Sequence, residues 1–389
     1  MEALTAVQVG AGWFSENPGG LDRYYHDLLD VLPEVGVQCR GLVVGTNAVE
    51  QETDGAVRTF ALPDEPLLRR WRNARAAVDR VWNSLPGSSK KVLVTHFALY
   101  GYPLIKHHDG RPWVVHFHGP WAEESRREGG RRLVTWIKRR LEKSVYREAD
   151  RIVVLSEAFR DLLCKTYGVP QERVDVIPGG VDLDRFADAA KTDRADARRS
   201  FGWPTNRPTV LSVRRLTNRM GLENLIDAIA LVRERVPEVL CLIAGRGPLV
   251  ETLAQKIDAL RLDQAVQLLG FVSDEDLPLA YRAADVSIMP SESLEGFGLS
   301  AAESLAAGTP VLVTPVGGLP EVVRGLDERL VLPDSSTKAI ADGLIAALTN
   351  PAALPGPEAC LAYAAKTFDW QVIGRRIADV YAKAANGRV

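Results

Sequence analysis

Short runs of branched apolar residues alternate with segments of helical periodicity along almost the whole chain. Gly20–Leu32 is typical of the helical segments, because its large apolar residues recur at i, i+3 and i+4. The alternation predicts βαβ units and parallel sheets, and so an α/β fold. Strands are predicted at Ala6–Gly10, Gln38–Val44, Val92–Thr95, Trp113–Phe117, Arg151–Leu155, Val174–Ile177, Thr209–Val213, Val239–Ala244, Val266–Leu269, Val286–Met289 and Val311–Val313.

The 389 residues are enough for two well-packed domains. The alternation stops after Pro178-Gly179-Gly180, and residues 186–208 are polar and rich in Ala, Asp and Arg. We therefore predict a first domain at 1–182, a linker at 183–207, and a second domain at 208–369. A last helix is predicted at Trp370–Ala385. The predicted architecture is two parallel-sheet domains with a cleft between them.

Composition excludes several classes of protein. Hydrophobic residues make up 46% and charged residues 25% of the chain, as in globular proteins. No apolar run approaches the ~20 residues of a membrane span, and no secretory signal is visible at the N-terminus. The four cysteines are scattered, with neither metal-ligand spacing nor a disulfide framework, and the net charge is −2. We expect a cytoplasmic protein that does not bind nucleic acid.

The most informative loop runs from Met289 to Glu303, after a predicted strand and into a predicted helix. Gly296 and Gly298 allow a ligand close to the backbone, and the start of the helix suits a phosphate. Glu303 is placed two helical turns in, where a carboxylate can accept two hydrogen bonds from a ribose diol. A plain glycine turn followed by a solvated helix glutamate is the alternative interpretation.

Other strand ends add to this pattern. Residues 210–221 contain Arg214, Arg215 and Arg219, whose guanidinium groups can neutralise a diphosphate. Ala244-Gly-Arg-Gly-Pro248 is another glycine-rich turn between a strand and a helix. In the first half, Gly19-Gly20 precedes a helix and His118-Gly119 closes a strand. Because ligands bind at the carboxyl ends of parallel strands, these loops predict one binding site.

The run Glu295-Gly-Phe-Gly…Glu303 resembles the Glu-x7-Glu signature of retaining glycosyltransferases of family 4, which have the GT-B fold. The resemblance covers nearly the whole chain. It extends to Gly19-Gly20, His118-Gly119, Ile177-Pro-Gly-Gly-Val-Asp182, Arg215-Leu216, Gly245-x-Gly-Pro248, Gly308-x-Pro310-Val311 and Gly317-Gly-Leu-Pro-Glu321. It implies two Rossmann-like domains facing across a cleft. The donor would bind mainly to the C-terminal domain, the acceptor would face the N-terminal domain, and a last helix at about 370–389 would cross back.

The resemblance also implies roles for individual residues. Glu303 would hold the ribose, and Glu295 would contact hydroxyls of the donor sugar. Arg215 would stabilise the diphosphate, and His118 would lie beside the reacting sugar. Arg215, Glu295 and His118 are thus the predicted catalytic residues. The predicted donor-binding residues are Gly19, Gly20, Arg219, Arg246, Gly247, Phe271, Val272, Gly296, Phe297, Gly298, Leu299, Ser300 and Glu303.

Two positions depart from the family pattern. The family usually has a lysine five residues after the arginine, where this chain has Met220. Our hypothesis is that Arg219 supplies the missing cation. The familiar Pro-Asn-Gly-Val sequence is also changed, with Gly179 in place of the asparagine.

The predicted function is a retaining, metal-independent glycosyltransferase without a cofactor. In the mechanism generally proposed for the family, the acceptor attacks from the leaving-group side and no protein base is required. The expected donor is UDP-glucose or a similar UDP-hexose. The expected acceptor is a saccharide or lipid-linked saccharide in envelope or exopolysaccharide synthesis. The alternatives are a UDP-sugar epimerase of GT-B architecture and a non-catalytic subunit that binds nucleotide sugars.

Three further features have competing interpretations. Asp182-Leu-Asp184 has the spacing of some metal-dependent transferases but follows a linker turn. His96, His116 and His118 could form a metal cluster but lack a neighbouring carboxylate or cysteine; His96 could also lie near the acceptor or be structural.

Ser125–Glu148 is strongly basic and carries an apolar stripe formed by Leu133, Trp136, Ile137, Leu141 and Val145. It is either a core-packed helix with a solvated face or a helix that contacts an anionic membrane. Arg69–Arg80 is a second basic stretch in the same domain.

Overall fold

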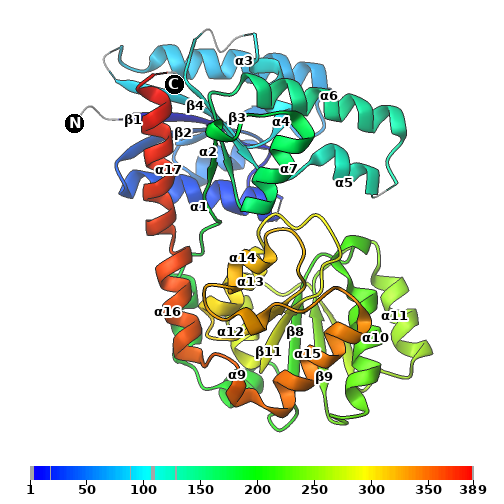
Figure 1. Cartoon of the computed structure of the whole chain (residues 1–389). Helices are drawn as coiled ribbons and strands as arrows, with labels where there is room; N and C mark the ends of the chain where they lie inside the picture. Colours follow the sequence, from blue (N-terminus) through cyan, green and yellow to red (C-terminus); the bar gives the residue numbers. More distant parts are fainter. Residues whose placement is uncertain (1–3, 18, 88, 107–109, 128, 388–389) are drawn as a thin grey trace. The chain divides into compact units, whose positions relative to one another are not determined.

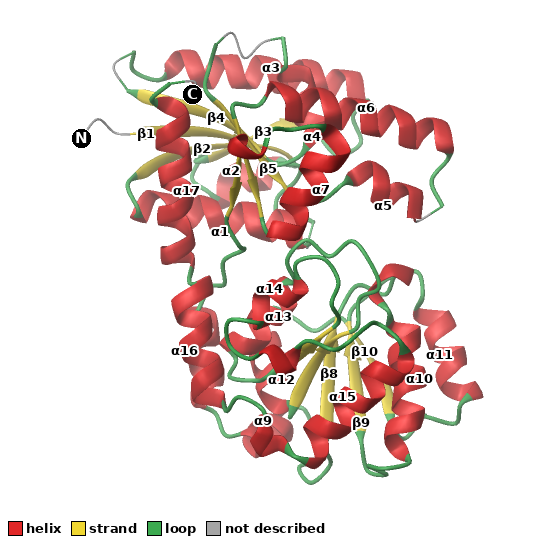
Figure 2. Ribbon diagram, in the orientation of Figure 1, coloured by secondary structure: helices red, strands yellow, loops and turns green. Residues whose placement is uncertain are grey.

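The structure, a computed structural model, describes residues 4–17, 19–87, 89–106, 110–127 and 129–387. The chain forms two compact units. Unit 1 extends to Gly180 and includes the chain from Trp370 onward, and unit 2 is Val181–Asp369. Each unit has one parallel sheet with helices packed on it (Figures 1 and 2).

The sheet of unit 1 has seven strands in the order β3-β2-β1-β4-β5-β6-β7, all parallel. The strands are β1 (Leu4–Val9), β2 (Val37–Val44), β3 (Val57–Ala61), β4 (Lys90–Thr95), β5 (Trp113–Phe117), β6 (Arg151–Val154) and β7 (Val174–Val176). Sequence analysis predicted all of them except β3. That strand is a short edge strand containing Arg58 and Thr59, so it shows no apolar run.

Alternate residues along these strands face two different apolar clusters. Ala6 packs on one face with residues of the first and last helices of the unit. Val7 and Val9 pack on the other face, with residues of four helices. The helices and turns of unit 1 are α1 (Gly20–Glu34), α2 (Asn47–Glu52), α3 (Leu67–Ser84), α4 (Ala98–Gly101), η1 (Tyr102–Leu104), α5 (Trp121–Arg127), α6 (Arg132–Glu148), α7 (Glu157–Tyr167), η2 (Gln171–Arg173) and α17 (Trp370–Ala385).

Unit 2 has a five-stranded parallel sheet in the order β10-β9-β8-β11-β12. All five of its strands were predicted, at nearly the observed bounds. The strands are β8 (Thr209–Val213), β9 (Leu240–Ala244), β10 (Val266–Gly270), β11 (Val286–Met289) and β12 (Val311–Val313). The helices and turns are η3 (Asp184–Phe186), α8 (Ala187–Lys191), α9 (Arg194–Ser200), η4 (Asn218–Met220), α10 (Leu222–Arg233), α11 (Val250–Ala259), α12 (Leu277–Ala283), α13 (Leu299–Ala306), α14 (Leu319–Val323), η5 (Glu328–Leu330), α15 (Thr337–Thr349), η6 (Pro351–Ala353) and α16 (Pro357–Phe368).

The polar stretch predicted as a linker is a structured part of unit 2. It contains η3, α8 and α9, and Arg198 on α9 is only 4% exposed. The Arg198 guanidinium donates to the carbonyl of Ala283 at 2.8 Å and to Asp285 at 2.7 Å. At least one charged residue of this stretch is therefore a buried ion-pair partner, which composition alone cannot distinguish from a solvated linker residue.

Within the described residues, no helix combines the length and apolarity that crossing a membrane requires.

Glu142 on α6 is a buried carboxyl group in unit 1. It accepts hydrogen bonds from Tyr167 Oη at 2.9 Å and from the Ala122 amide at 3.2 Å. Burial raises its pKa from 4.5 to about 7, although these hydrogen bonds oppose the shift. Since the pKa is higher in the folded state, its contribution to stability is complete below about pH 4.5 and is lost as the pH rises through 7.

We expect Glu142→Gln to become increasingly stabilising, relative to wild type, between pH 5 and pH 8. The difference should reach about 2–3 kcal/mol, since each pKa unit corresponds to ~1.4 kcal/mol. Urea unfolding of both proteins at several pH values measures this. Glu148→Gln, at an exposed position of the same helix, is the control. Parallel stability curves for wild type and Glu142→Gln would contradict the assignment.

Candidate functional site

The loops at the carboxyl ends of β8 and β11 are joined by a buried ion pair between Arg214 and Glu295. The Arg214 side chain is 5% exposed and the Glu295 side chain 14% exposed. Arg214 also donates to Ser291 Oγ at 2.5 Å. Burial alone would raise the pKa of Glu295, but Arg214, Arg219 and Ser291 together lower it below its usual value. Glu295 is therefore a fixed anion at a strand end.

The arginine beside this glutamate is Arg214, a residue to which sequence analysis gave no separate role. Arg215, which the resemblance marked as the diphosphate ligand, is exposed. Arg214 is buried and bound to Glu295. Arg214 directly follows β8, so its side chain takes the direction opposite to that of Arg215. The motif spacing marks Arg215 as the diphosphate ligand, and the structure adds its neighbour Arg214 as the arginine that contacts Glu295.

Met220 and Arg219 lie on the same loop. Met220 Sδ is 2.9 Å from Arg214 Nη2, and the side chain is buried. A lysine at position 220 would thus place a second cation beside Arg214. The Arg219 guanidinium donates to the Leu294 carbonyl at 2.9 Å, and its charge helps to lower the pKa of Glu295. Arg219 is therefore close enough to Glu295 to add positive charge there.

Two glycines allow neighbouring loops to contact the backbone of the paired residues. A Cβ on Gly245 would lie 1.8 Å from the Arg214 carbonyl oxygen. A Cβ on Gly317 would lie 1.9 Å from the Glu295 carbonyl oxygen, and Gly317 has a φ of +56°. Both glycines are thus required by packing between loops, and they hold the Arg214–Glu295 pair from the backbone side.

We expect Gly317→Ala to destabilise unit 2 by about 1–3 kcal/mol, because the added methyl group overlaps a backbone oxygen. Its melting temperature should fall by several degrees. Gly20→Ala is the control, since a Cβ there meets nothing within 4 Å. Thermal unfolding of the two variants checks this, and equal melting temperatures would show that the loop yields easily.

Glu303 lies on α13 and is 5% exposed. Its Oε1 accepts from Arg185 at 2.9 Å, and its Oε2 accepts from Tyr281 Oη at 3.3 Å. Sequence analysis missed Arg185, because that residue falls within the segment predicted as a linker. Each carboxylate oxygen has two lone pairs, so Glu303 keeps the capacity to accept further hydrogen bonds.

The start of α13 brings together the other predicted residues of this loop. The amides of Ala301 and Ala302 bond to the carbonyl of Gly298, as is usual in a first turn. Phe297 is buried and packs edge-on against Phe368, with ring centroids 5.5 Å apart. Only the main chain of Phe297 could therefore serve a ligand. Gly296, Leu299 and Ser300 are half-buried.

Arg246 and Phe271 form an exposed pair after β9 and β10. The Arg246 guanidinium carbon lies 4.6 Å from the centroid of the Phe271 ring, a cation–π arrangement. Phe271 is 51% exposed, and Val272 beside it is half-buried. Gly247 packs closely on the 214–221 loop, where a Cβ would be 2.3 Å from the Leu216 carbonyl oxygen.

The predicted residues of unit 1 are at the ends of β1 and β5. Gly19 and Gly20 are exposed at the start of α1. Asp22, which sequence analysis did not single out, is buried in the first turn of α1 and accepts from Asn17 Nδ2 at 2.7 Å. Burial raises the pKa of Asp22.

His118 belongs to a stack of three histidines on the face of the sheet that α1 and α17 cover. His96 and His116 have ring centroids 4.4 Å apart, and His96 Nδ1 lies 3.4 Å from His118 Nε2. Because β4 and β5 are adjacent, parallel strands, His96 after β4 lies close to His116 and His118 at the end of β5. Burial lowers the pKa of all three, in the case of His118 to about 3, so the stack is neutral.

The nitrogen atoms of this stack lie within 4.8 Å of one another, a spacing that could hold a metal ion. Both nitrogens of His116 already have hydroxyl partners, Tyr24 at 3.2 Å and Tyr381 at 2.8 Å. Nε2 of His96 is 2.7 Å from Gln8 Oε1. These contacts favour a hydrogen-bonded core over a metal centre.

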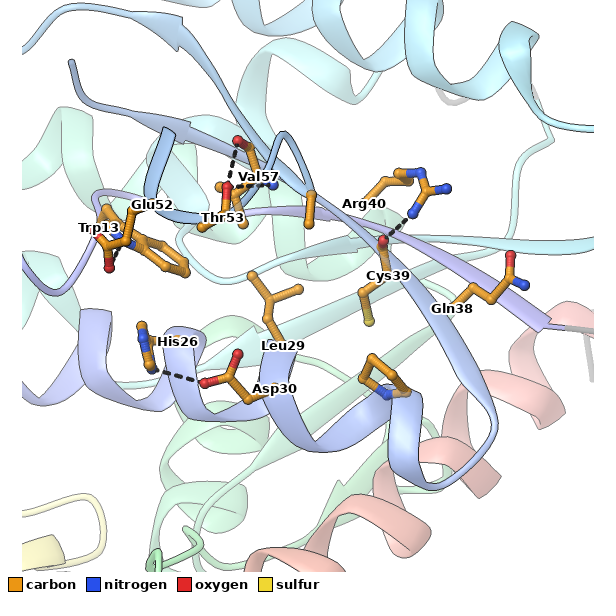
Figure 3. Close-up of a pocket in the computed structure, with 12 residues that line it drawn as sticks. Trp13, His26, Leu29, Asp30, Gln38, Cys39, Arg40, Glu52, Thr53 and Val57 are labelled. Carbon is orange, nitrogen blue, oxygen red and sulfur yellow. Dashed lines mark hydrogen bonds and ion pairs between the residues drawn. The ribbon is translucent and has the colours of Figure 1, made fainter. Parts of the chain in front are cut away.

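A pocket of about 510 Å³ lies elsewhere in unit 1, between α1, β2 and the end of α2 (Figure 3). Leu29, Cys39 and Val57 form its apolar part. At one end, Trp13 Nε1 donates to Glu52 at 2.9 Å. None of the predicted site residues lines this pocket, so it is separate from the loops described above.

Comparison with known proteins assigns the class. The family model described as Glycosyltransferase Family 4 matches residues 18–185, and that described as Glycosyl transferases group 1 matches residues 193–367. The two parallel-sheet α/β units are those of the GT-B fold, as predicted. The chain belongs to the GT-B glycosyltransferases of family 4.

The individual relatives share about one-third of their residues or fewer with this chain over the matched regions. The chain is 34% identical over 183 residues to mannosylfructose-phosphate synthase of Agrobacterium fabrum, a match that covers 45% of this chain and 40% of the relative. Sucrose-phosphate synthase of Thermosynechococcus elongatus has a similar structure, with a TM-score of 0.78 and 22% identity over 98% of both chains. So does Anabaena HepE in complex with UDP and glucose, with a TM-score of 0.77, 19% identity, and coverage of 97% and 99%.

Proposed function

We propose that this glycosyltransferase is a retaining, metal-independent hexosyltransferase whose donor binds to the loops of unit 2. The buried Arg214–Glu295 pair beside the start of α13 carries the proposal. A nucleotide-sugar donor needs positive charge at its diphosphate and a fixed anion at its sugar hydroxyls, and this pair offers both within one hydrogen-bonded group.

The remaining predicted residues fit the same donor. Glu303 accepts the ribose hydroxyls, and the amides at the start of α13 bind phosphate oxygens. The Arg246–Phe271 pair gives the base a flat, exposed surface on which to stack. Guanidinium groups and helix amides can take the developing charge of the leaving group, so the proposed reaction requires no metal ion.

We propose UDP-glucose or a similar UDP-hexose as the donor, and a saccharide or lipid-linked saccharide at the cytoplasmic membrane face as the acceptor. HepE in complex with UDP and glucose supports a UDP donor. Mannosylfructose-phosphate synthase is a reason to test GDP-mannose as well. His118 and Gly19-Gly20 are the proposed contacts of unit 1 with the substrates.

Thermal-shift measurements with UDP-, GDP- and ADP-sugars test the donor, because a ligand that binds only the folded state raises its apparent stability. A saturable shift with one nucleotide class is expected, and no shift with any donor would contradict the proposal.

Met220, in place of the family lysine, favours a second candidate: a non-catalytic subunit that binds nucleotide sugars. Slow release of free sugar and nucleotide from donor alone would rule that candidate out.

A further inference from the structure

The first half of α6 carries large apolar side chains that the rest of unit 1 does not cover. Leu133 is 69% exposed, Trp136 57%, Ile137 50% and Val134 42%. Leu133, Trp136 and Ile137 are spaced i, i+3 and i+4, so they share one face of the helix. Figure 1 shows α5 and this part of α6 projecting from the remainder of the unit.

The same apolar stripe is buried farther along the helix. Leu141 and Val145 belong to the core of unit 1. The sequence-based interpretation of a core-packed helix therefore holds for the second half of α6 and is wrong for the first. Large apolar residues gathered within one exposed turn and a half mark an interaction surface.

Basic residues surround the exposed face. Arg131, Arg132, Arg139, Arg140 and Lys143 are all exposed. The Arg140 guanidinium lies 5.7 Å from the Trp136 ring centroid. Two of the nearby acids do not offset this charge, since Glu123 is paired with Arg126 and Glu142 is buried.

The second basic stretch, on α3, makes a smaller contribution than its sequence predicts. Arg69 pairs with Glu65 at 3.0 Å, and Arg70 donates to Tyr100 Oη at 3.0 Å. Arg75 donates to the Pro103 carbonyl at 2.7 Å. These three guanidinium groups have partners inside the unit, whereas Arg72 and Arg80 of the same helix are exposed, so α3 keeps part of its positive charge.

We propose that the first half of α6 docks on an anionic lipid surface, with Leu133, Trp136 and Ile137 entering the boundary between headgroups and acyl chains. This proposal rests on the proposed function in one respect: docking on the membrane would bring the enzyme to a lipid-linked acceptor. A helix with an apolar face flanked by arginines is the arrangement that lies in a membrane interface. A second copy of the chain fits less well, because a two-fold contact would set one basic patch against another.

The test is flotation of the whole chain with vesicles of phosphatidylcholine alone and of phosphatidylcholine with one-third phosphatidylglycerol. We expect binding only to the anionic vesicles, weakened at least ten-fold by 0.5 M salt. The triple variant Leu133→Ser/Trp136→Ser/Ile137→Ser should bind at least ten-fold more weakly than wild type. Leu68→Ser, at a 76% exposed apolar position on α3, is the matched control and should bind like wild type.

Insertion has its own measurement. Lipids brominated along their acyl chains should quench wild-type tryptophan fluorescence, and Trp136→Phe should remove most of that quenching. The absence of flotation at low salt would overturn the proposal, as would a triple variant that floats like wild type. Self-association of wild type that the triple variant abolishes would assign the surface to a second copy instead. Thermal shifts with nucleotide sugars should be unchanged in the triple variant, so a failure of donor binding is distinguishable from a failure of docking.

Discussion

Arg214→Ala should lower kcat by about 10²–10³-fold, the range seen when one preorganised transition-state donor is lost. Negative charge grows on the diphosphate as the glycosidic bond breaks, and Arg214 is the buried guanidinium paired with Glu295. Its neighbour supplies a matched control. If Arg214 alone carries this role, Arg215→Ala should stay within a few-fold of wild type, whereas a comparable loss would assign the role to the exposed Arg215 as well. Steady-state kinetics with one working donor measures both variants.

A reversed result, with Arg215→Ala the damaging change, would restore the assignment made from motif spacing. A rescue experiment sharpens the test. Because Met220 Sδ lies 2.9 Å from Arg214 Nη2, Met220→Lys in the Arg214→Ala background should recover part of the lost turnover. Arg219→Ala, tested separately, should also lower turnover if Arg219 supplies the second cation. Wild-type turnover in Arg219→Ala would leave Arg214 as the cation that matters.

Glu303→Ala should weaken binding of both nucleotide and nucleotide sugar by about 1–3 kcal/mol, roughly 5- to 150-fold. The buried carboxylate is the proposed acceptor for the ribose hydroxyls, so free UDP should lose as much affinity as the complete donor. Titration calorimetry measures both. Glu292→Ala, at an exposed glutamate of the preceding loop, is the control.

Arg185 allows the ribose role of Glu303 to be separated from its structural role. Arg185→Ala removes one partner of Glu303 but leaves the carboxylate, so it should weaken binding less than Glu303→Ala does. Melting curves of both variants establish that unit 2 is folded. Unchanged UDP affinity in a folded Glu303→Ala protein would show that the ribose is held elsewhere.

The sequence by itself determined the two parallel sheets. Helical segments separate successive strand-like runs, of which Val92–Thr95 and Val286–Met289 are examples. Such segments are the crossover connections that parallel strands need, so few other sheet topologies are possible. The same pattern located the loops where ligands bind, since parallel strands present their carboxyl ends at one edge. The family followed from motifs in those loops.

Tertiary structure decided what composition and spacing leave open. Arg214 and Arg215 are identical in type and adjacent, so only the direction of the chain after β8 determines which one reaches Glu295. Arg185 and Arg198 lie in the segment that the sequence predicts to be a linker. In the fold they contact Glu303 and Asp285, which are about ninety residues or more away in the sequence.

The stripe on α6 is the clearest case of this kind. Its helical periodicity is the same over both halves, yet Leu141 is buried and Leu133 is 69% exposed. Burial depends on where the rest of unit 1 ends, and that boundary is a property of the packed fold. The sequence therefore determined that an amphipathic helix would form, and the tertiary structure determined that half of its apolar face would remain available to a partner.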